Sequence, residues 1–374
     1  MTDLQKQVQA VVDELVDSGA ERGVQAAVCR NGELLVDVVA GVADPGTGRV
    51  MTSDTPVFVT STGKGVVATV FAVLAERGAI SYDTRIAELW PEFGAHGKDK
   101  ATVRDALTHS VGTPGLPAEL MPDAYLDWDG MCALIAGAKP WWEPGTRSGY
   151  HAVTFGWITG EIVRRATGKR ISEVLLDEVA GPLGIGRELF FGVPAAELSR
   201  LAVLEDAPFD PSAFSEESAE GDAASIPEDD HDGWVWAPPA TMPDAAYGNR
   251  TDLAQTDIPA GCTATARALA KMYGALLHET EGVRLASPER VREITTECAG
   301  GIDAVFGMPV RRGLGFALGG FGGPLDSEDL FGMPGSGGTA AYADSGTGLA
   351  LAVTKNRNTF GDYTTYNKIA GALN

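Results

Sequence analysis

The chain has 374 residues, a net charge of −22 and a hydrophobic content of 44%. Its length exceeds what one small core needs and suits one large domain or two closely packed ones. The negative charge disfavours nucleic acid and anionic membrane surfaces as partners, because the summed field repels phosphates. Residues 205–232 contain eleven acids and no Lys or Arg. We expect this segment to be a solvated surface loop that secondarily disfavours anionic substrates.

The first twenty residues predict an amphipathic helix rather than a targeting segment. They lack a basic stretch followed by an apolar block. Their apolar residues recur at helical spacing on one side, namely Leu4, Val8, Val11, Val12 and Leu15. No run approaches the roughly 18 apolar residues that a membrane span requires. The sequence therefore predicts no membrane contact.

The four cysteines are Cys29, Cys132, Cys262 and Cys298. They are far apart and form no C-x-x-C pair, so we expect four small buried residues in a reducing compartment. Together with the N-terminal pattern, this predicts a cytoplasmic protein.

Two apolar runs, residues 24–31 and 33–41, meet at Asn31-Gly32. Asn-Gly between apolar runs predicts a β-hairpin. Further on, a helix is predicted from Ser61 to Gly78. Because this helix is apolar on most of its circumference, we expect it to be buried.

Helices and loops dominate residues 81–250, with helices expected at 102–110 and 155–168, the latter ending at Gly168. Another helix is expected at 263–279 and a last one at 363–373. Strands are expected at 312–320, 338–345 and 348–357.

Strands at both ends of the chain, with helices between them, do not follow a βαβ rhythm. The predicted fold is therefore α+β, with one antiparallel sheet flanked by the terminal helices and a mainly helical insertion. We expect residues 1–80 and 251–374 to form the sheet domain and residues 81–250 to form the inserted domain.

Ser61-Thr62-Gly63-Lys64 is the one S-x-x-K sequence in the chain. A spacing of three residues puts Ser61 and Lys64 on one helix face, one turn apart. Serine is a weak nucleophile that needs a neighbouring base, and a lysine in apolar surroundings loses its charge readily enough to be one. A serine in a first helical turn also presents its own backbone N–H to an oxyanion. The alternative is an N-cap serine beside an exposed lysine, which the apolar residues after Lys64 disfavour.

Tyr150 is the candidate proton carrier. It follows a Pro-Gly turn at residues 144–145 and precedes a predicted helix. Tyr247 is a rival, because Tyr247-Gly248-Asn249 is the one literal Tyr-x-Asn. We prefer Tyr150, since Tyr247 lies in a Pro- and Asp-rich stretch expected to lack a regular mount.

The glycine-rich run at residues 331–339 leads into a strand. Glycines allow backbone to approach a ligand closely, so the Ser336 N–H is a candidate second oxyanion donor. Met333, Gly335 and Gly337 are candidate substrate contacts. A simple glycine-rich turn is the alternative.

Aromatic and histidine residues add weaker candidates. Trp142 is a candidate substrate contact, and Trp141 and Trp157 could line the same pocket, although core packing is the commoner use of such rings. We expect His109 to be structural. His151 follows Tyr150 in the sequence but is expected to point elsewhere, and it is a weaker candidate for a role outside the reacting groups. The histidine spacings do not suit a metal, and no nucleotide-binding motif occurs, so we expect no metal and no cofactor. The sequence contains no G-x-S-x-G motif, and this absence argues against an α/β-hydrolase.

Taken together, these motifs resemble the serine β-lactamase/penicillin-binding protein superfamily, and within it the class C-like family VIII carboxylesterases. The resemblance extends from about Val24 to Arg357 and includes TVRDALTHS, WEPGT…Y…FGWITGEIVRRATGK and FGMPGSGGTAAYADSGTGLALAVTKNR. It implies an acyl-enzyme at Ser61, proton transfer shared by Lys64 and Tyr150, and an oxyanion held by the N–H groups of Ser61 and Ser336.

One residue departs from that superfamily. Its β-lactamases and peptidases have Lys-Thr-Gly where this chain has Met333-Pro334-Gly335. A thioether neither binds a carboxylate nor relays a proton. We therefore expect a carboxylesterase acting on small or medium uncharged esters. An acyltransferase or amide-forming enzyme on thioesters or amines is the alternative, followed by a β-lactamase or D-peptidase and, last, an inactive binding protein.

Overall fold

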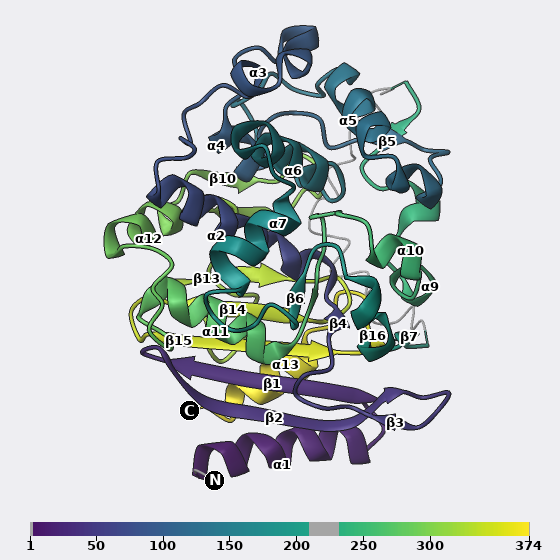
Figure 1. Cartoon of the computed structure of the whole chain (residues 1–374), viewed down its shortest axis with the longest axis vertical. Helices are drawn as coiled ribbons and strands as arrows, with labels where there is room; N and C mark the ends of the chain where they lie inside the picture. Colours follow the sequence, from purple (N-terminus) through teal and green to yellow (C-terminus); the bar gives the residue numbers. More distant parts are fainter. Residues whose placement is uncertain (1–2, 209–231, 374) are drawn as a thin grey trace.

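The computed structural model describes residues 3–208 and 232–373. In this part of the chain, a nine-stranded antiparallel sheet forms the centre, and β1 lies between β15 and β2 (Figure 1). Both ends of the chain therefore build one sheet, as predicted. In spatial order the strands are β10 (Ala299–Ile302), β11 (Pro309–Arg312), β12 (Ala317–Leu318), β13 (Leu330–Pro334), β14 (Ala340–Asp344), β15 (Leu349–Lys355), β1 (Gly23–Arg30), β2 (Glu33–Asp44) and β3 (Arg49–Val50).

The predicted hairpin at Asn31-Gly32 is present. Both turn residues have positive φ, 51° at Asn31 and 85° at Gly32, as a type I′ turn requires. The turn joins β1 to β2, which pair antiparallel over their length.

The two faces of the sheet bury different helices. Alternate residues of β1 point to opposite sides, so Val24 and Ala26 pack with the terminal helices α1 (Asp3–Asp17) and α13 (Thr364–Gly371). Ala27 packs on the opposite side, in the larger cluster that contains helix α11 (Ala266–Leu277). The terminal helices therefore flank the sheet as the sequence predicts.

Most of the described residues between 81 and 204 lie above the sheet in Figure 1, including helices α3 (Ile86–Leu89) to α6 (Thr154–Thr167), whereas β6 (Leu189–Phe190) and β7 (Glu205–Asp206) lie at the level of the sheet. We propose two domains. Residues 1–80 and 251–374 together form the sheet domain, and residues 81–250 form the inserted domain. None of the helices in the described residues combines the length and apolarity that crossing a membrane requires. The remaining α-helices are α2 (Gly63–Glu76), α3 (Ile86–Leu89), α4 (Val103–Leu107), α5 (Trp128–Gly137), α6 (Thr154–Thr167), α7 (Ile171–Leu175), α9 (Ala245–Gly248), α10 (Thr251–Ala254) and α12 (Pro288–Thr295).

Short strands complete the fold around the loops. They form the three-stranded set β4 (Val57–Phe58), β9 (Thr263–Ala264) and β6 (Leu189–Phe190), and the pairs β5 (Leu116–Pro117) with β8 (Trp234–Val235) and β7 (Glu205–Asp206) with β16 (Arg357–Asn358).

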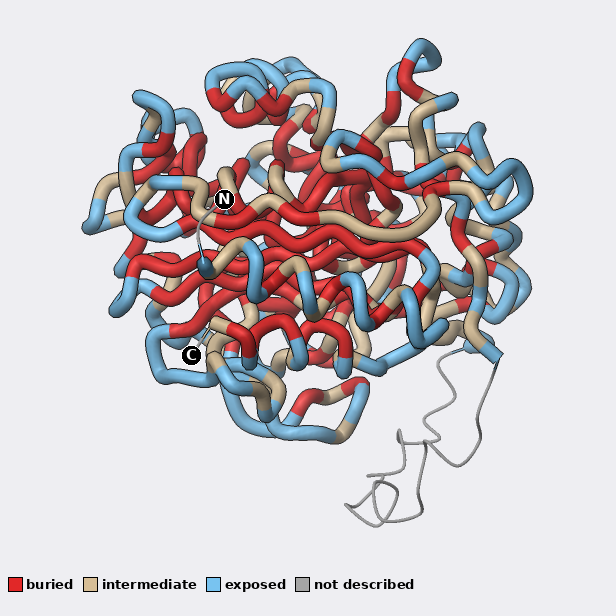
Figure 2. Tube along the Cα trace, turned by 90° about the horizontal axis from the view of Figure 1, so that it is seen from below, coloured by how far each residue is buried: buried red, intermediate tan, exposed pale blue. Residues whose placement is uncertain are grey.

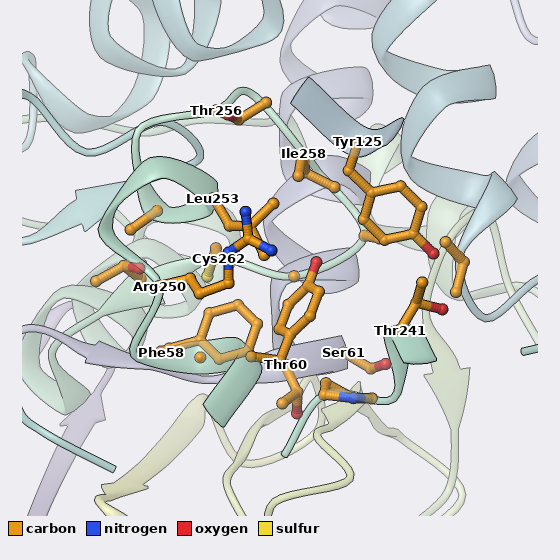
Figure 3. A pocket seen from close by; sticks show the side chains of 18 of the residues that line it. Phe58, Thr60, Ser61, Tyr125, Thr241, Arg250, Leu253, Thr256, Ile258 and Cys262 are labelled. Atoms are coloured by element: carbon orange, nitrogen blue, oxygen red, sulfur yellow. The ribbon is translucent and has the colours of Figure 1, made fainter. Parts of the chain in front are cut away.

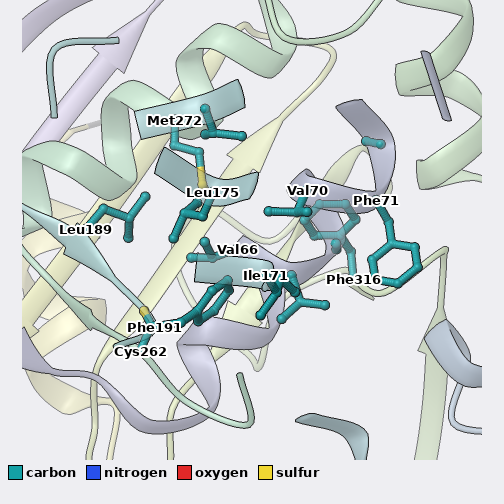
Figure 4. Packing of buried hydrophobic residues seen from close by; sticks show 14 of the residues in the cluster. Val66, Val70, Phe71, Ile171, Leu175, Leu189, Phe191, Cys262, Met272 and Phe316 are labelled. Atoms are coloured by element: carbon teal, nitrogen blue, oxygen red, sulfur yellow. The ribbon is translucent and has the colours of Figure 1, made fainter. Parts of the chain in front are cut away.

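Helix α2 is the buried centre of the larger cluster. All of its residues from Gly63 to Ala75 are buried, as its apolar circumference predicts. Figure 4 shows Val66, Val70 and Phe71 of α2 among side chains from α7, β6 and α11. Figure 2 shows the same pattern at the level of the chain, with buried central strands and exposure concentrated in the outer turns.

Two local predictions are wrong. Residues 312–320 are not one strand, because Gly313 donates a hydrogen bond to the Phe316 carbonyl and Gly315 has a φ of 86°. The apolar side chains of this tight turn are buried although they do not alternate between the two faces of a strand. Cys298 is exposed rather than buried, whereas the other three cysteines are buried and all four are free.

The acidic loop falls mostly at residues 209–231, outside the described part of the chain.

Candidate active site

The Ser61 turn is fixed by contacts from distant segments. Ser61 lies in a 3-10 turn, Thr60–Thr62, between β4 and α2. Val59, which precedes the turn, donates its N–H to the Cys262 carbonyl at 2.9 Å. Its own carbonyl accepts a hydrogen bond from the Thr339 hydroxyl at 3.0 Å. Thr60 has a φ of 48°, a conformation that costs a non-glycine residue about 1 kcal/mol. The surrounding contacts therefore hold Ser61 on a strained turn.

Lys64 is fully buried one turn after Ser61. Its Nζ lies 3.0 Å from Ser61 Oγ, 2.8 Å from the Ala152 carbonyl and 2.9 Å from the Ala260 carbonyl. Burial lowers the pKa of Lys64 to about 7. A neutral amine has two N–H bonds and one lone pair. The two carbonyls accept both N–H bonds, so the lone pair faces the Ser61 hydroxyl, as proton abstraction requires.

Lys98 is a useful comparison, because it is also fully buried. Its Nζ donates to three carbonyls, those of Ala95, Ala136 and Ala138. Three acceptors use all three protons of an ammonium and leave no lone pair for chemistry. Lys98 is thus arranged as a structural cross-link, whereas Lys64 has a hydroxyl in the third position.

Tyr150 reaches the same hydroxyl. It lies just before α6, its hydroxyl interacts by hydrogen bonding with the Ser61 side chain, and its ring centroid is 5.1 Å from Lys64 Nζ. Burial raises the pKa of Tyr150, and the bond to Ser61 only partly offsets this. The structure therefore brings together the three predicted residues Ser61, Lys64 and Tyr150, with a neutral phenol beside an amine of lower pKa.

The glycine-rich turn after β13 packs directly against the Ser61 turn. A Cβ at Gly335 would lie 2.4 Å from the Val59 carbonyl and 2.5 Å from the hydroxyls of Thr60 and Thr339. Glycine is therefore required for this close approach. Among the hydrogen bonds of the described residues, none engages the backbone N–H of Ser61 or of Ser336. Both N–H groups are therefore free donors in the described part of the chain, and their role as the oxyanion donors stays a prediction.

We expect Gly335→Ala to lower kcat about 100-fold, because the added methyl would displace the Ser336 N–H. Steady-state kinetics on a p-nitrophenyl ester measure the effect. Gly137→Ala is the matched control, since no atom lies within 4 Å of a Cβ there. An unchanged kcat in Gly335→Ala would remove Ser336 as an oxyanion donor.

A pocket opens beside Ser61, with about 710 Å³ of space that includes open solvent. Apolar and aromatic side chains dominate its wall, and Arg250 also lines it. Figure 3 shows Ser61 and Thr60 on one side of the pocket and Arg250 and Thr256 towards the other. The lining residues with the largest side chains are Phe58, Tyr125, Phe191, Tyr247, Arg250, Leu253 and Ile258.

Several predicted contacts lie outside the described lining of this pocket. Trp142 is buried, donates its Nε1–H to the Ser110 carbonyl at 3.3 Å, and packs edge-on against His151. Met333 lies on β13, and Gly335 and Gly337 lie on the turn that follows it. None of the three lines the described pocket, so their contact with a substrate stays a prediction. Trp141 and Trp157 are not among the lining residues either.

Tyr247 is placed differently from our expectation. It lies on the short helix α9 rather than in an irregular loop, and it lines the pocket. Its ring is 6.0 Å from that of Phe58, centroid to centroid. The sequence signal for this helix was Asp244, a residue type that favours helix N-caps. Its carboxylate caps α9 by accepting the Tyr247 N–H at 2.7 Å. Sequence reasoning also missed Phe58, Tyr125 and Arg250 as pocket residues.

The cations near the site are paired with acids. Arg250 contacts Asp252 at 2.5 Å and Asp123 at 2.7 Å. Arg312 forms a buried pair with Asp303, and Lys355, close to the glycine-rich turn, pairs with Glu21. These three cations thus give the site little net positive charge.

Comparison with known proteins identifies the family. The family model described as Beta-lactamase matches residues 8–373. The chain belongs to the beta-lactamase family. As a member, it is a hydrolase of the beta-lactamase fold, which confirms the resemblance drawn from its motifs.

Two relatives cover most of this beta-lactamase family chain. Esterase/beta-lactamase LipL of Mycobacterium tuberculosis is 35% identical over 340 residues, covering 90% of this chain and 77% of LipL. Esterase EstB of Burkholderia gladioli is 27% identical over 360 residues, covering 91% of this chain and 84% of EstB. A solved family VIII carboxylesterase superimposes with a TM-score of 0.85 at 32% identity, covering 99% of this chain and 97% of the other.

Proposed function

We propose that this chain is a carboxylesterase that forms an acyl-enzyme at Ser61 and acts on small or medium uncharged esters. The observation that carries the proposal is the fully buried Lys64 amine, held by two carbonyls with its third position 3.0 Å from Ser61 Oγ. The esterase names of LipL, EstB and the family VIII carboxylesterase support the substrate class.

In the proposed reaction, the pKa values make Lys64 the general base and Tyr150 the general acid. Neutral Lys64, with a pKa of about 7, removes the Ser61 hydroxyl proton while Oγ attacks the ester carbonyl. The Ser61 and Ser336 N–H groups stabilise the oxyanion. Tyr150, whose pKa is raised, stays protonated and donates its proton to the departing alkoxide. The Lys64 ammonium returns a proton to Tyr150, and water then cleaves the acyl-enzyme by the same route.

The substrate class follows from the pocket. Its largely apolar wall favours an alkyl or aryl acyl group, because burying each CH₂ contributes about 0.8 kcal/mol. Arg250 is paired with two acids, so the pocket gives a substrate carboxylate little compensation for desolvation.

A panel of p-nitrophenyl esters with acyl chains of increasing length tests this proposal. We expect measurable turnover of acetate to octanoate esters and slow hydrolysis of esters that carry a carboxylate. A panel hydrolysed no faster than by the Ser61→Ala variant would contradict it.

We expect Ala254→Phe to shift the chain-length preference. Ala254 lines the pocket, and a larger side chain there shortens it. Losing contact with two methylenes removes about 1.6 kcal/mol, or roughly fifteenfold in kcat/KM. Octanoate turnover should fall by about that factor while acetate turnover stays unchanged, so acetate is the internal control. Equal losses on both esters would place the acyl chain elsewhere.

An acyltransferase that uses the same acyl-enzyme is the second candidate. Transfer requires that water be excluded, but the candidate pocket residues Trp141, Trp142 and Trp157 do not line the pocket. Thioester donors with amine or alcohol acceptors test it, and transfer that outruns hydrolysis would favour it. Nitrocefin turnover tests the β-lactamase alternative, which Met333 disfavours.

A further inference from the structure

The segment Gly149–Ala152 brings two groups to the candidate centre, although it belongs to no helix or strand. The Tyr150 hydroxyl interacts with Ser61, and the Ala152 carbonyl accepts a hydrogen bond from Lys64. In a loop, such groups keep a fixed geometry only if neighbouring residues hold the backbone.

His151 holds this segment from within. Its imidazole is buried, with Nδ1 2.6 Å from the Gly149 carbonyl and Nε2 3.1 Å from the Thr113 nitrogen. The carbonyl can only accept and the Thr113 N–H can only donate. The imidazole must therefore carry its proton on Nδ1 and remain neutral.

His109 holds the segment from the opposite side. Its Nδ1 accepts the His151 backbone N–H at 3.1 Å, and its carbonyl accepts the Gly149 N–H at 3.0 Å. These two bonds bracket Tyr150, whose ring lies 4.8 Å from the His109 ring. His109 has a φ of 59°, so its backbone bends in a way that few residues other than glycine adopt.

Charged groups around the two rings do not favour their protonation. Arg312 and Lys64 face His109, and Arg312 and Asp303 face His151. Asp303 is already engaged, because it pairs with Arg312 and accepts the Tyr150 N–H at 3.2 Å. Burial lowers the pKa of both imidazoles, that of His151 to about 3. Both rings therefore stay neutral across the working pH range.

We propose that His109 and His151 are a neutral pair of positioning residues that hold Tyr150 and the Ala152 carbonyl against Ser61 and Lys64. Neither imidazole touches the reacting atoms. His109 bonds the backbone on both sides of Tyr150, and His151 ties the Gly149 carbonyl to the Thr113 N–H. This inference rests on the proposed esterase function, in which Tyr150 transfers a proton.

Two variants of His109 distinguish the effect of its hydrogen-bond acceptor from the effect of its size. In His109→Asn, an oxygen replaces Nδ1 at the same distance along the side chain, whereas His109→Leu has no acceptor. We expect His109→Leu to lower kcat about 100-fold with KM changed less than threefold, because Tyr150 acts in the transition state. His109→Asn should recover at least tenfold of that loss.

A double-mutant cycle distinguishes positioning from general structural damage. In a Tyr150→Phe background, His109→Leu should lower kcat at least tenfold less than it does in the wild type, because the Tyr150 hydroxyl, one of the two groups that it positions, is already absent. If the two losses multiply instead, the proposal is wrong. If His109→Leu does not fold, as judged by its thermal transition, His109→Gln replaces it, since its acceptor is displaced by one bond.

Labelling separates this inference from the proposed function. A fluorophosphonate should add mass to Ser61 in the wild type. Absence of labelling would contradict the esterase proposal itself, whereas labelling together with multiplying losses would contradict only the role of the histidine pair.

Discussion

Replacing Ser61 by alanine is expected to lower kcat/KM for p-nitrophenyl esters by about 10⁴-fold or more, and to abolish labelling by a fluorophosphonate. The reason is that Lys64 and Tyr150 both direct their polar atoms to the Ser61 side chain, so its removal leaves the amine without a hydroxyl to deprotonate. Initial-rate kinetics and intact mass measure the two effects.

Ser18→Ala is the control for this variant, because Ser18 is remote in sequence and, within residues 3–208 and 232–373, its hydroxyl bonds only the Leu15 carbonyl. It should match the wild type in rate and labelling. If Ser61→Ala retained activity, or if the reagent labelled another residue, Ser61 would not be the nucleophile.

Replacing Lys64 by methionine is expected to lower kcat/KM by about 10³-fold, since a general base contributes 10²–10⁴-fold. In the wild type the base must be neutral. With a pKa of about 7, Lys64 is protonated at lower pH, so kcat/KM should fall about tenfold per pH unit below 7 and level off above it. In Lys64→Met this acidic limb should disappear, because no amine titrates. A pH profile from 5 to 9 measures both effects.

Lys98→Met is the matched control. Lys98 is equally buried, and its pKa is lowered to about 8 by burial, but its Nζ donates to three carbonyls and to no hydroxyl of the described residues. This variant should lose stability and keep the midpoint near pH 7. A midpoint that moves in Lys98→Met, or an acidic limb that persists in Lys64→Met, would show that another group governs the profile.

Local rules predicted much of the fold. The Asn31-Gly32 turn, the buried helix α2 and the Gly168 cap of α6 depend on a few neighbouring residues, and all three are present. The rules failed at 312–320, where apolar residues are buried in a glycine turn instead of a strand. Burial alone does not distinguish the two, because both hide the same side chains from water.

The choice between Tyr150 and Tyr247 shows where sequence reasoning ends. The preference for Tyr150 rested on the lack of a mount at Tyr247, yet Tyr247 has one, the capped helix α9. Proximity separates the two instead, since Tyr150 interacts with Ser61 whereas Tyr247 lines the pocket. That proximity depends on contacts with His109 and Asp303, which lie far from Tyr150 in the chain.

The sequence by itself determined the family, the antiparallel sheet built from both chain ends, and the placement of Ser61 and Lys64 on one helix face, because the order of motifs, the order of strands and helices, and the spacing of three residues can all be read along the chain. Only the tertiary structure decided the pKa of Lys64 and the shape of the pocket. Carbonyls from residues 152 and 260 surround the amine, and residues between 58 and 263 assemble the pocket wall. Desolvation and pocket shape arise from segments that meet only when the chain is folded, so no local pattern encodes them.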